Sequence, residues 1–312
     1  IYMERKFLPD MVGIVRSNPK ANVGSVLSEG FDGHFAYKQK LGKVNLTIRG
    51  NMTYSKNEIL ERDETNTVYP YQLEKGYRVN QAKGLIALGL FKDYDDIRNS
   101  PKQQFGKVQP GDIKYKDVNG DGNINSEDEV AIGATTKPNL TYGFGVTAKW
   151  KGFDVNVHFQ GVGKSSYFIN GSSVWMFTNV NGDDNTAWGN ILSAMASGNR
   201  WISHEISGTM DTEDPNADYP RLSYGGNSNN YRNSTFWLRD GSYLRLKTLD
   251  VGYSLPSNVV RKIHCNSVRF FFIGTNLLTW SKFDLWDPEM GSSDGKNYPL
   301  NRSYSLGVSI NL

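Results

Sequence analysis

The sequence predicts an all-β protein, and three of its features lead to that fold class. Several segments alternate strictly between apolar and polar residues, which is the two-residue period of a strand. The 312 residues include 32 glycines and 17 tyrosines, whereas long segments with the apolar spacing of an amphipathic helix are missing. The connections between the alternating segments are either very short or very long.

The first third of the chain contains two clear strands. In KVNLTIRGNMTY every second residue of Val44–Tyr54 lies on one face, which is mostly apolar, and polar residues lie on the other. Upstream, Phe31–Lys38 alternates in the same way, so a short Leu41-Gly42 turn is expected to join the two strands. A partial strand is also expected near Ile1–Lys6.

Five further strands follow. LTYGFGVTAKWKGFDVNVHFQG predicts two strands joined at a tight Lys151-Gly152 turn. SYLRLKTLDVGY predicts a strand with a bulge, because its phase slips near Thr248. VRFFFIGTNLL is apolar on both faces, so its inward side is expected to meet packed protein, and SYSLGVSINL alternates to the last residue. The total is about eight antiparallel strands.

The lengths of the connections favour a transmembrane β-barrel. Short turns at one end of the strands and long loops at the other are typical of outer-membrane barrels, whereas loops beyond about 15 residues are uncommon in compact soluble domains. Aromatic residues near strand ends fit the two girdles of such a barrel. They are Tyr54, Trp150, Tyr253, Trp280 and Tyr304. A β-sandwich also alternates, so this second fold stays open on the pattern alone.

Composition narrows the function. The net charge of +3 without a basic block disfavours nucleic acid as a partner. The single cysteine, Cys265, excludes an internal disulfide framework. There is no GxSxG, HExxH, P-loop or dinucleotide motif, so we expect no enzymatic activity. The first residue is Ile1 without a preceding signal peptide, and the chain is expected to be a fragment or a processed product.

One stretch within the long connection 57–138 has the spacing of an EF-hand-like metal loop. KDVNGDGNINSEDE places Asp117, Asn119 and Asp121 at positions one, three and five, with a glycine at position six. Asn123 would contribute its backbone carbonyl at position seven, and Asp128 stands at position twelve. Oxygen ligands at this spacing suit Ca²⁺, or Mg²⁺. The loop 117–128 is therefore a candidate metal site.

The same loop lacks the parts of a calcium sensor. Position twelve is Asp rather than Glu, no amphipathic helix precedes the loop, and there is no second hand. We therefore expect a structural calcium or magnesium site that stiffens a long external loop. Ile124 at position eight is expected to anchor it, and Ser126 with Glu129 has the spacing of a capping box. The alternative is an Asx-rich turn without an ion.

The second long connection is rich in aromatic residues beside asparagine, aspartate and glycine. Sugars bind by stacking on aromatic rings while amides and carboxylates accept their hydroxyl groups. Trp175, Trp188 and Trp201 are therefore candidate substrate-binding residues. The simpler interpretation is that these rings pack the loop against itself. Polar positions on one strand face, such as Arg49, Asp154 and His158, are candidates for holding a plug or lining a path.

Several segments resemble one family of transporters. PGDIKYKDVNGDGNINSEDEVAIG followed by NLTYGFGVTAKWKGFDVNVHFQG is similar to a characteristic region of SusC/RagA-like TonB-dependent outer-membrane transporters. YLRLKTLDVGYSLP, VRFFFIGTNLLTWSKFDLWDPEM and NRSYSLGVSINL resemble the closing strands of the same family, in the same order. One departure is the last residue, Leu312, where outer-membrane barrels commonly end on an aromatic residue.

The resemblance implies that residues 1–312 are the C-terminal portion of a large transmembrane β-barrel with long extracellular loops. The plug domain, the segment that engages TonB and the N-terminal barrel strands would lie outside this chain. It also implies import of oligosaccharides, or of peptides, across the outer membrane of a Bacteroidetes-type bacterium. A SusD-like surface lipoprotein would be the partner, and two such pairs would form a dimer. The alternative is a secreted, calcium-stabilised β-sandwich that binds glycans.

Overall fold

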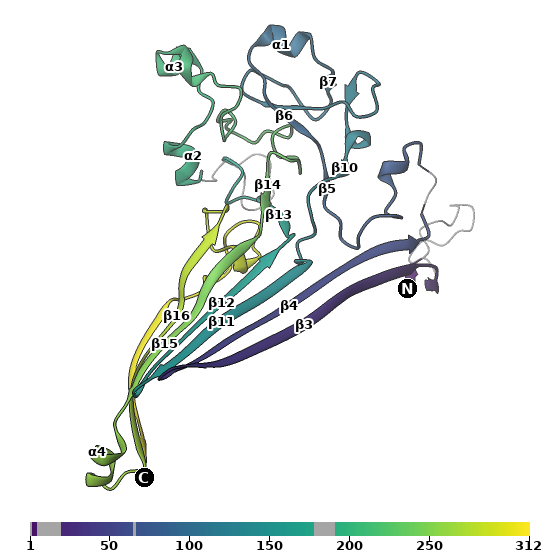
Figure 1. Cartoon of the computed structure of the whole chain (residues 1–312). Helices are drawn as coiled ribbons and strands as arrows, with labels where there is room; N and C mark the ends of the chain where they lie inside the picture. Colours follow the sequence, from purple (N-terminus) through teal and green to yellow (C-terminus); the bar gives the residue numbers. More distant parts are fainter. Residues whose placement is uncertain (1, 5–19, 65–66, 178–190) are drawn as a thin grey trace.

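The structure is a computed structural model that describes residues 2–4, 20–64, 67–177 and 191–312. Its main element is one antiparallel sheet of seven strands in the order β17-β16-β15-β12-β11-β4-β3 (Figure 1). The strands are β3 Ser25–Leu41, β4 Val44–Glu61, β11 Leu140–Trp150, β12 Phe153–Gly163, β15 Tyr243–Ser254, β16 Ser267–Ser281 and β17 Ser303–Asn311. Each strand pairs with its predecessor in the sheet, so the connections are simple hairpins.

Short connections lie at one end of this sheet and long connections at the other (Figure 1). Gly42 and Lys43 link β3 to β4, and Gly42 has a φ of +61°. Lys151 and Gly152 link β11 to β12 with φ values of +46° and +91°, as a type I′ hairpin turn requires. The third link at this end contains the helix α4 Ser257–Lys262. The predicted alternation of short and long connections is confirmed.

The two faces of the sheet differ in polarity. One face of the sheet carries large, exposed apolar side chains. Every strand contributes to them, although the middle of β12 does not, and they include Phe35, Phe144, Val146, Phe270 and Leu306. A β-sandwich would bury such a face against a second sheet. In the described part of the chain no second sheet covers it, because the other sheets have two strands each. The sheet is therefore a portion of a large β-barrel, as predicted, and the sandwich alternative is wrong.

The predicted aromatic residues lie near the two ends of the strands. At the short-turn end the ring centroids of Phe153 and Tyr253 are 4.5 Å apart, and those of Trp150 and Phe153 are 6.5 Å apart. At the long-loop end Trp280 is 50% exposed and its ring centroid lies 6.3 Å from that of Phe159. Two aromatic bands on the apolar face agree with the girdles of an outer-membrane barrel.

Three sequence-based boundaries need correction. Of the partial strand expected near Ile1–Lys6, the described residues form β1 Tyr2–Glu4, which pairs with β2 Lys20–Asn22 in a separate sheet. The main sheet thus contains seven of the about eight expected strands, and β1 lies outside it. β4 extends to Glu61, so residues 57–61 of the expected loop 57–138 continue the ladder with β3. Leu41 ends its strand and is not a turn residue.

The bulge predicted near Thr248 is confirmed. The register of β15 shifts between Leu246 and Thr248 against β16, and between the same residues against β12. Against β12 the extra residue is Lys247, whereas against β16 the extra residue lies on β16, because Lys247 stands opposite both Asn276 and Leu277. No helix in the described ranges is long and apolar enough to cross a membrane.

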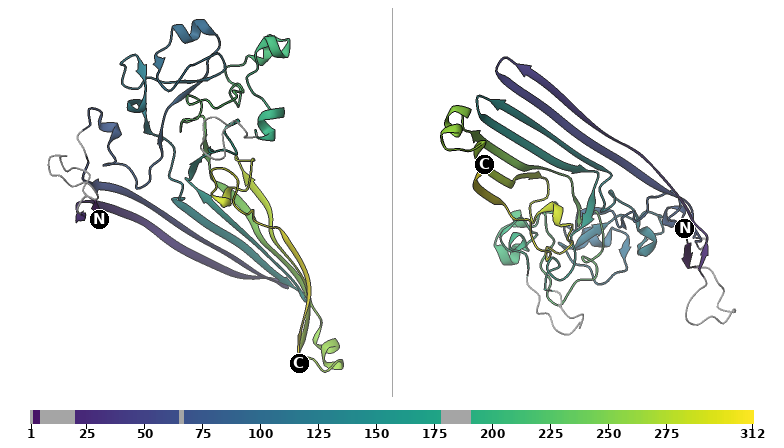
Figure 2. Two further views of the ribbon diagram at one scale, coloured as in Figure 1. Left: turned by 180° about the vertical axis from the view of Figure 1, so that it is seen from behind. Right: turned by 90° about the horizontal axis from the view of Figure 1, so that it is seen from below.

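The long connections fold together into one body at the loop end of the sheet, which we call the loop body (Figures 1 and 2). It consists of the described residues in 62–139, 164–242 and 282–302. Its short elements are η2 Pro70–Gln72, β5 Lys83–Gly84, β6 Ala87–Leu90, α1 Tyr94–Arg98, β7 Lys102–Gln103, β8 Ile113–Tyr115, β9 Asn123–Ile124, η3 Ser126–Asp128, β10 Val130–Ala131, β13 Ser166–Phe168, α2 Ser193–Ser197, α3 His204–Ser207, η4 Met210–Thr212, β14 Leu238–Asp240 and η5 Pro288–Met290.

The loop body has its own hydrophobic core. The first connection supplies Leu85, Ile113 and Ile124, which are at most 1% exposed. The second supplies Met195 and Trp237, which are equally buried, and the third supplies Phe283. Burial of an apolar side chain of this size stabilises the fold by about 1.5–3 kcal/mol. Because one core unites all three connections, they form a folded unit.

Candidate functional site

The backbone of the predicted metal loop 117–128 has the expected shape. Gly120 and Gly122 have φ values of +77° and +81°, which a glycine adopts without strain. The carboxylate of Asp117 accepts hydrogen bonds from the amides of Gly120 and Gly122, at 2.7 and 2.9 Å. The loop therefore closes on its first residue, with glycine at position six making the turn.

The other predicted ligands are also held by loop amides. Asn119 Oδ1 accepts from the amide of Asp121, and Asp121 Oδ1 accepts from the amide of Asn123, at 3.0 and 2.7 Å. Asp128 is fully buried, and its two oxygens accept from the amides of Val118 and Asn125 at 2.7 and 2.9 Å. These hydrogen bonds fix the side chains of Asn119, Asp121 and Asp128, because each side chain is held by at least one backbone amide.

The fit to a cation is partial. Carboxylate oxygens that accept one N–H keep a second lone pair for a metal, and no ion pair in the described part of the chain involves Asp117, Asp121 or Asp128. On the other hand, the described residues contain no group of three or more His, Cys, Asp or Glu side chains that could hold a metal as they stand. The loop has the backbone and charge of a metal site, but its carboxylates do not meet at one point.

Neighbouring residues attach the loop to the rest of the molecule. Ile124 is 1% exposed and belongs to the hydrophobic core, so its predicted anchoring role is confirmed. Asn119 donates to the hydroxyl of Tyr69 at 3.2 Å, and Tyr71 donates to the carbonyl of Glu127 at 2.8 Å. Burial raises the pKa of Tyr71, and the charge of Asp128 raises it further. The side chains around the loop are therefore negatively charged.

The predicted capping box is displaced by one residue. η3 begins at Ser126, so its N-cap is Asn125 rather than Ser126. Asn125 Oδ1 accepts from the amide of Glu127 at 2.6 Å, and Asp128 reaches back to the amide of Asn125. The element is a single 3₁₀ turn, and in a turn this short the third residue is Asp128, not Glu129. Asp128 thus serves the cap and the metal loop together.

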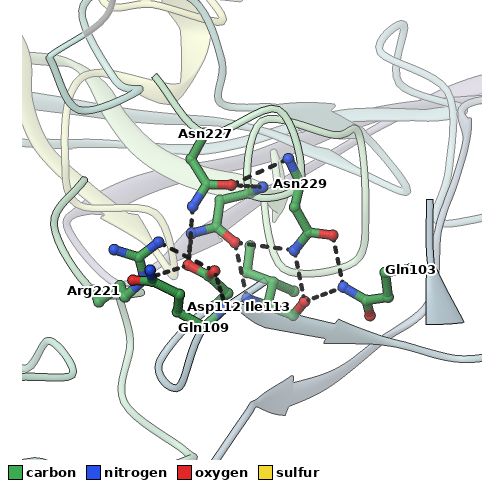
Figure 3. A network of polar contacts seen from close by, with 8 residues as sticks. Gln103, Gln109, Asp112, Ile113, Arg221, Asn227 and Asn229 are labelled. Atoms are coloured by element: carbon green, nitrogen blue, oxygen red, sulfur yellow. Dashed lines mark hydrogen bonds and ion pairs between the residues drawn. The ribbon is translucent and has the colours of Figure 1, made fainter. Parts of the chain in front are cut away.

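A buried polar network joins the first two connections of the loop body (Figure 3). The carboxylate of Asp112 is fully buried and lies 2.8 Å from Nε of Arg221. Asn227 and Asn230 donate to the same carboxylate at 2.9 and 3.0 Å, and the amide of Gln109 donates to its other oxygen. The charge of Asp112 is thereby compensated by one cation and three neutral donors, as a buried carboxylate requires.

The network continues along β8. The amide of Ile113 donates to Asn230 Oδ1, and its carbonyl accepts from Asn229 and Gln103, at 2.9 to 3.0 Å (Figure 3). The amide of Tyr115 donates to Gln103 Oε1 at 2.7 Å. The side-chain amides of Gln103, Asn229 and Asn230 therefore bind the backbone of β8 at Ile113 and Tyr115, in place of a second neighbouring strand. Nothing in the sequence analysis singled out these residues, although GGNSNN is a visible cluster of amides.

The tryptophan candidates have different outcomes. Trp175 is half-buried, and its ring stacks on that of Tyr231 at 5.2 Å and 11°. Trp201 is 6% exposed and packs on Gly111, where a Cβ would lie 2.4 Å from the indole ring. Trp188 lies outside the described residues. At Trp175 and Trp201 one ring face is already occupied by the protein, which is the packing role that the sequence left as the alternative.

Two candidate residues on the polar face of the sheet, Asp154 and Arg49, bind side chains of other strands. For the candidate His158, Nδ1 is buried without a hydrogen-bond partner in the described part of the chain. Arg269 donates to Asp154 at 2.5 Å and to Asp250 at 2.7 Å, and Arg49 donates to Asn156 at 2.7 Å. Three neighbouring strands, β12, β15 and β16, are connected in this way. The charges of Arg269, Asp154 and Asp250 are thus paired within the wall.

Comparisons with known proteins agree with the resemblance found in the sequence. The chain is 30% identical over 240 residues to "TonB-dependent receptor P26" of Formosa agariphila, a match that covers 73% of this chain and 22% of that protein. It is 27% identical over 334 residues to "TonB-dependent receptor P3" of the same organism, covering 97% of this chain and 30% of that protein. No protein-family model matches the sequence.

Among solved structures, the fold is similar to that of the RagAB peptide importer in its open-open state, with a TM-score of 0.70 and 21% identity. That match covers 100% of this chain and 31% of the other. The structure of the RagAB peptide transporter matches with a TM-score of 0.68 and 20% identity over 98% of this chain. The chain thus spans between 22% and 31% of the length of these relatives.

Proposed function

We propose that this chain, which is a segment of a SusC/RagA-like TonB-dependent transporter, supplies barrel wall and external loops for import across the outer membrane. The observation that carries the proposal is the combination of an exposed apolar sheet face with a folded loop body at one end. The apolar face suits lipid, and the loop body suits the extracellular side. Energy would come from TonB acting on a plug domain, and the chain would perform no chemistry on the substrate.

The substrate is proposed to be an oligosaccharide or a peptide. RagAB, the similar structure, is described as a peptide importer, which favours peptides. Trp175 and Trp201 pack within the loop body, so these two residues give less support to sugar stacking than the sequence suggested. A SusD-like surface lipoprotein is proposed as the partner that covers the loop body, and two such pairs as a dimer. The location is the outer membrane of a Bacteroidetes-type bacterium.

We further propose that the loop 117–128 binds Ca²⁺, with Mg²⁺ as the alternative ion. Asp117, Asn119, Asp121 and Asp128 would provide side-chain oxygens, and Asn123 its backbone carbonyl. The support is the closed loop, the glycine at position six and three carboxylates without an ion pair. Binding would draw these carboxylates together, because they do not yet form a metal cage. The role would be to stiffen the loop body.

The test of transport is fractionation followed by uptake. The full-length protein should pellet with the outer membrane, leave it only in detergent, and bring a lipoprotein with it. Cells that carry it should accumulate a fluorescent oligopeptide or oligosaccharide, and cells without TonB should not. A full-length protein that stays soluble in buffer would refute the membrane location. Uptake that persists without TonB would refute the energised mechanism.

A further inference from the structure

A groove of about 440 Å³ lies on the apolar face of the sheet, near the short turns. Two rows of side chains from β15, β16 and β17 form its walls, and the members of each row stand opposite one another in the sheet. The residues between the two rows point to the other face, so the floor of the groove is backbone. The rows are Tyr253, Phe270 and Val308, and Val251, Phe272 and Leu306.

The walls of the groove remain exposed in the structure. Leu306 is 86% exposed, Val308 is 51% exposed and Phe270 is 47% exposed. All three are apolar and belong to the face that suits the hydrocarbon of a bilayer. An acyl chain is the apolar ligand that this environment supplies.

Aromatic rings and one lysine mark the end of the groove that faces the short turns. The rings of Trp150, Phe153 and Tyr253 follow one another on this face, as described above. Nζ of Lys151 lies 5.2 Å from the ring centroid of Trp150, so the ammonium group is on the same side of the wall. Trp and Tyr are enriched at the depth of lipid headgroups, and lysines near the end of a span extend their ammonium groups to that depth. Lys151 is therefore placed to meet a headgroup.

The short-turn end of the wall is basic. Two cations lie within two residues of each short link, and among the described residues none of the six takes part in an ion pair. The side-chain carboxylates of segments 38–49, 146–156 and 249–272 are Asp154 and Asp250, and both are paired with Arg269. This end therefore has an uncompensated positive charge. The six cations are Lys40, Lys43, Lys149, Lys151, Arg261 and Lys262.

The link that contains α4 brings two of these cations to the neighbourhood of Lys151. The amide of Ser254, three residues before α4, donates to the carbonyl of Gly152 at 2.8 Å, so the two links are neighbours. α4 lies at the short-turn end of the molecule, and Arg261 and Lys262 in its last turn are exposed (Figure 1). Val259 and Ile263, one turn apart, are also exposed, at 41% and 52%. Exposed apolar and cationic residues on one helix suit the surface of a bilayer.

We propose that this end of the wall binds an anionic phospholipid, with an acyl chain in the groove and the phosphate beside Lys151, Arg261 and Lys262. The groove alone would suit any lipid, and the cations alone would suit any anion. A ligand that satisfies both is an anionic lipid, because each Lys or Arg near the bilayer surface attracts its headgroup. The inference rests on the proposed location in the outer membrane.

The headgroup is tested by native mass spectrometry of the full-length transporter in detergent, titrated with phosphatidylglycerol and with phosphatidylcholine of the same acyl chains. The wild type is expected to bind phosphatidylglycerol about tenfold more tightly or better. Lys151→Gln/Arg261→Gln/Lys262→Gln should bind the two lipids equally. The matched control is Lys75→Gln/Lys102→Gln/Lys107→Gln, which removes three exposed cations from the loop body and should keep the preference.

The groove is tested with Val308→Trp, which places a larger side chain in one of its walls. The affinity for both lipids should fall by about tenfold, because the acyl chain loses its place whatever the headgroup. Val146→Trp is the control, since Val146 is exposed on the same face but does not line the groove. It should bind both lipids like the wild type.

The possible failures are distinguishable. Equal affinity of the wild type for the two lipids would overturn the proposal, and so would a preference that persists without the three cations. If Val308→Trp turns dimers into monomers and leaves lipid binding unchanged, a second copy covers the groove and the lipid is refuted. In each of these cases the transporter still requires detergent. A full-length protein that stays soluble in buffer would instead refute the membrane location itself.

Discussion

The carboxylate of Asp112 and the guanidinium of Arg221 form an ion pair of 2.8 Å that joins two connections 109 residues apart in the chain. Asp112 is fully buried, whereas the side chain of Arg221 is 21% exposed. The pair therefore connects the core of the loop body to its surface. The contacts of Asn227 and Asn230 with the same carboxylate make it the centre of the network (Figure 3).

Replacing Asp112 by Ala is expected to loosen the loop body without unfolding the sheet. Removal of one partner of a buried ion pair costs about 3–5 kcal/mol, because the other charge stays without compensation. Hydrogen exchange of the purified full-length protein should rise in 103–115 and 221–237 and stay constant in the strands. The control is Asp95→Ala, whose partner Arg98 is 70% exposed, and it should change stability by less than about 1 kcal/mol. Unchanged exchange in Asp112→Ala would contradict the network's role.

Gly111→Ala is expected to displace Trp201. Gly111 has a φ of +82°, and an added Cβ would lie 2.4 Å from the indole, so the substitution combines backbone strain with overpacking. The combined cost is expected to be about 2–4 kcal/mol. Gly120→Ala is the matched control, because Gly120 has a φ of +77° but no atom within 4 Å of the added Cβ. Thermal melting and tryptophan fluorescence should separate the two variants, and equal losses would show that strain alone matters.

The strands could be predicted from the sequence because each has one apolar face. The period of two that begins at Val44 predicted β4 as far as Tyr54, although the strand continues to Glu61, and the slip near Thr248 located a bulge that the register confirms. The loop body could not be predicted in the same way. Its core residues, such as Leu85 and Met195, come from different connections and follow no period, so they look like isolated apolar residues in polar loops.

The candidate sites show a similar division. Local spacing was sufficient to predict the shape of the loop 117–128, because the hydrogen bonds within the loop join residues at most ten positions apart. The environment of Trp201 depends on Gly111 and on a fold that brings distant segments together. The sequence shows that a tryptophan is present, but it cannot show which face of the indole ring is left open to a ligand.

Glu213 is expected to give α3 a dependence on pH. The pKa of Glu213 lies below the ordinary value of 4.5, because the backbone amide of His204 donates to the carboxylate and the imidazole of His204 donates to it as well. A carboxylate with a lowered pKa in the folded state stabilises that state above its unfolded pKa, and the contribution is lost as the pH falls through the folded value. Protection of amides in 203–213 should therefore fall below about pH 4.5 more in the wild type than in Glu213→Gln. Parallel curves for the two proteins would refute this role.

A charge on the apolar sheet face is expected to hinder membrane insertion. Val146 is 38% exposed on that face of β11, and Arg near the middle of a bilayer costs about 2–4 kcal/mol in a barrel. Val146→Arg should lower the folded fraction of the full-length protein in lipid vesicles, measured by heat-modifiable migration in gels. The control is Thr147→Arg at the same depth, because Thr147 faces Asn156 on the polar side. If Thr147→Arg is the more damaging variant, the assignment of the faces is wrong.

Calcium is expected to raise the thermal stability of the loop body. An ion that binds only the folded state at 100 times its dissociation constant stabilises that state by about 2.7 kcal/mol. The melting temperature of the full-length protein should therefore rise with Ca²⁺ and fall with a chelator, and Asp117→Asn with Asp121→Asn should abolish the response. Asn at position 121 can keep the bond from the amide of Asn123, whereas Asn at position 117 keeps only one of the two bonds from the amides of Gly120 and Gly122. The melting temperature without Ca²⁺ therefore serves as the control for the shape of the loop. Asp95→Asn, on α1, should respond to Ca²⁺ like the wild type. A larger rise with Mg²⁺ would identify the smaller ion, and no rise with either would leave the loop as an Asx-rich turn held by its own amides.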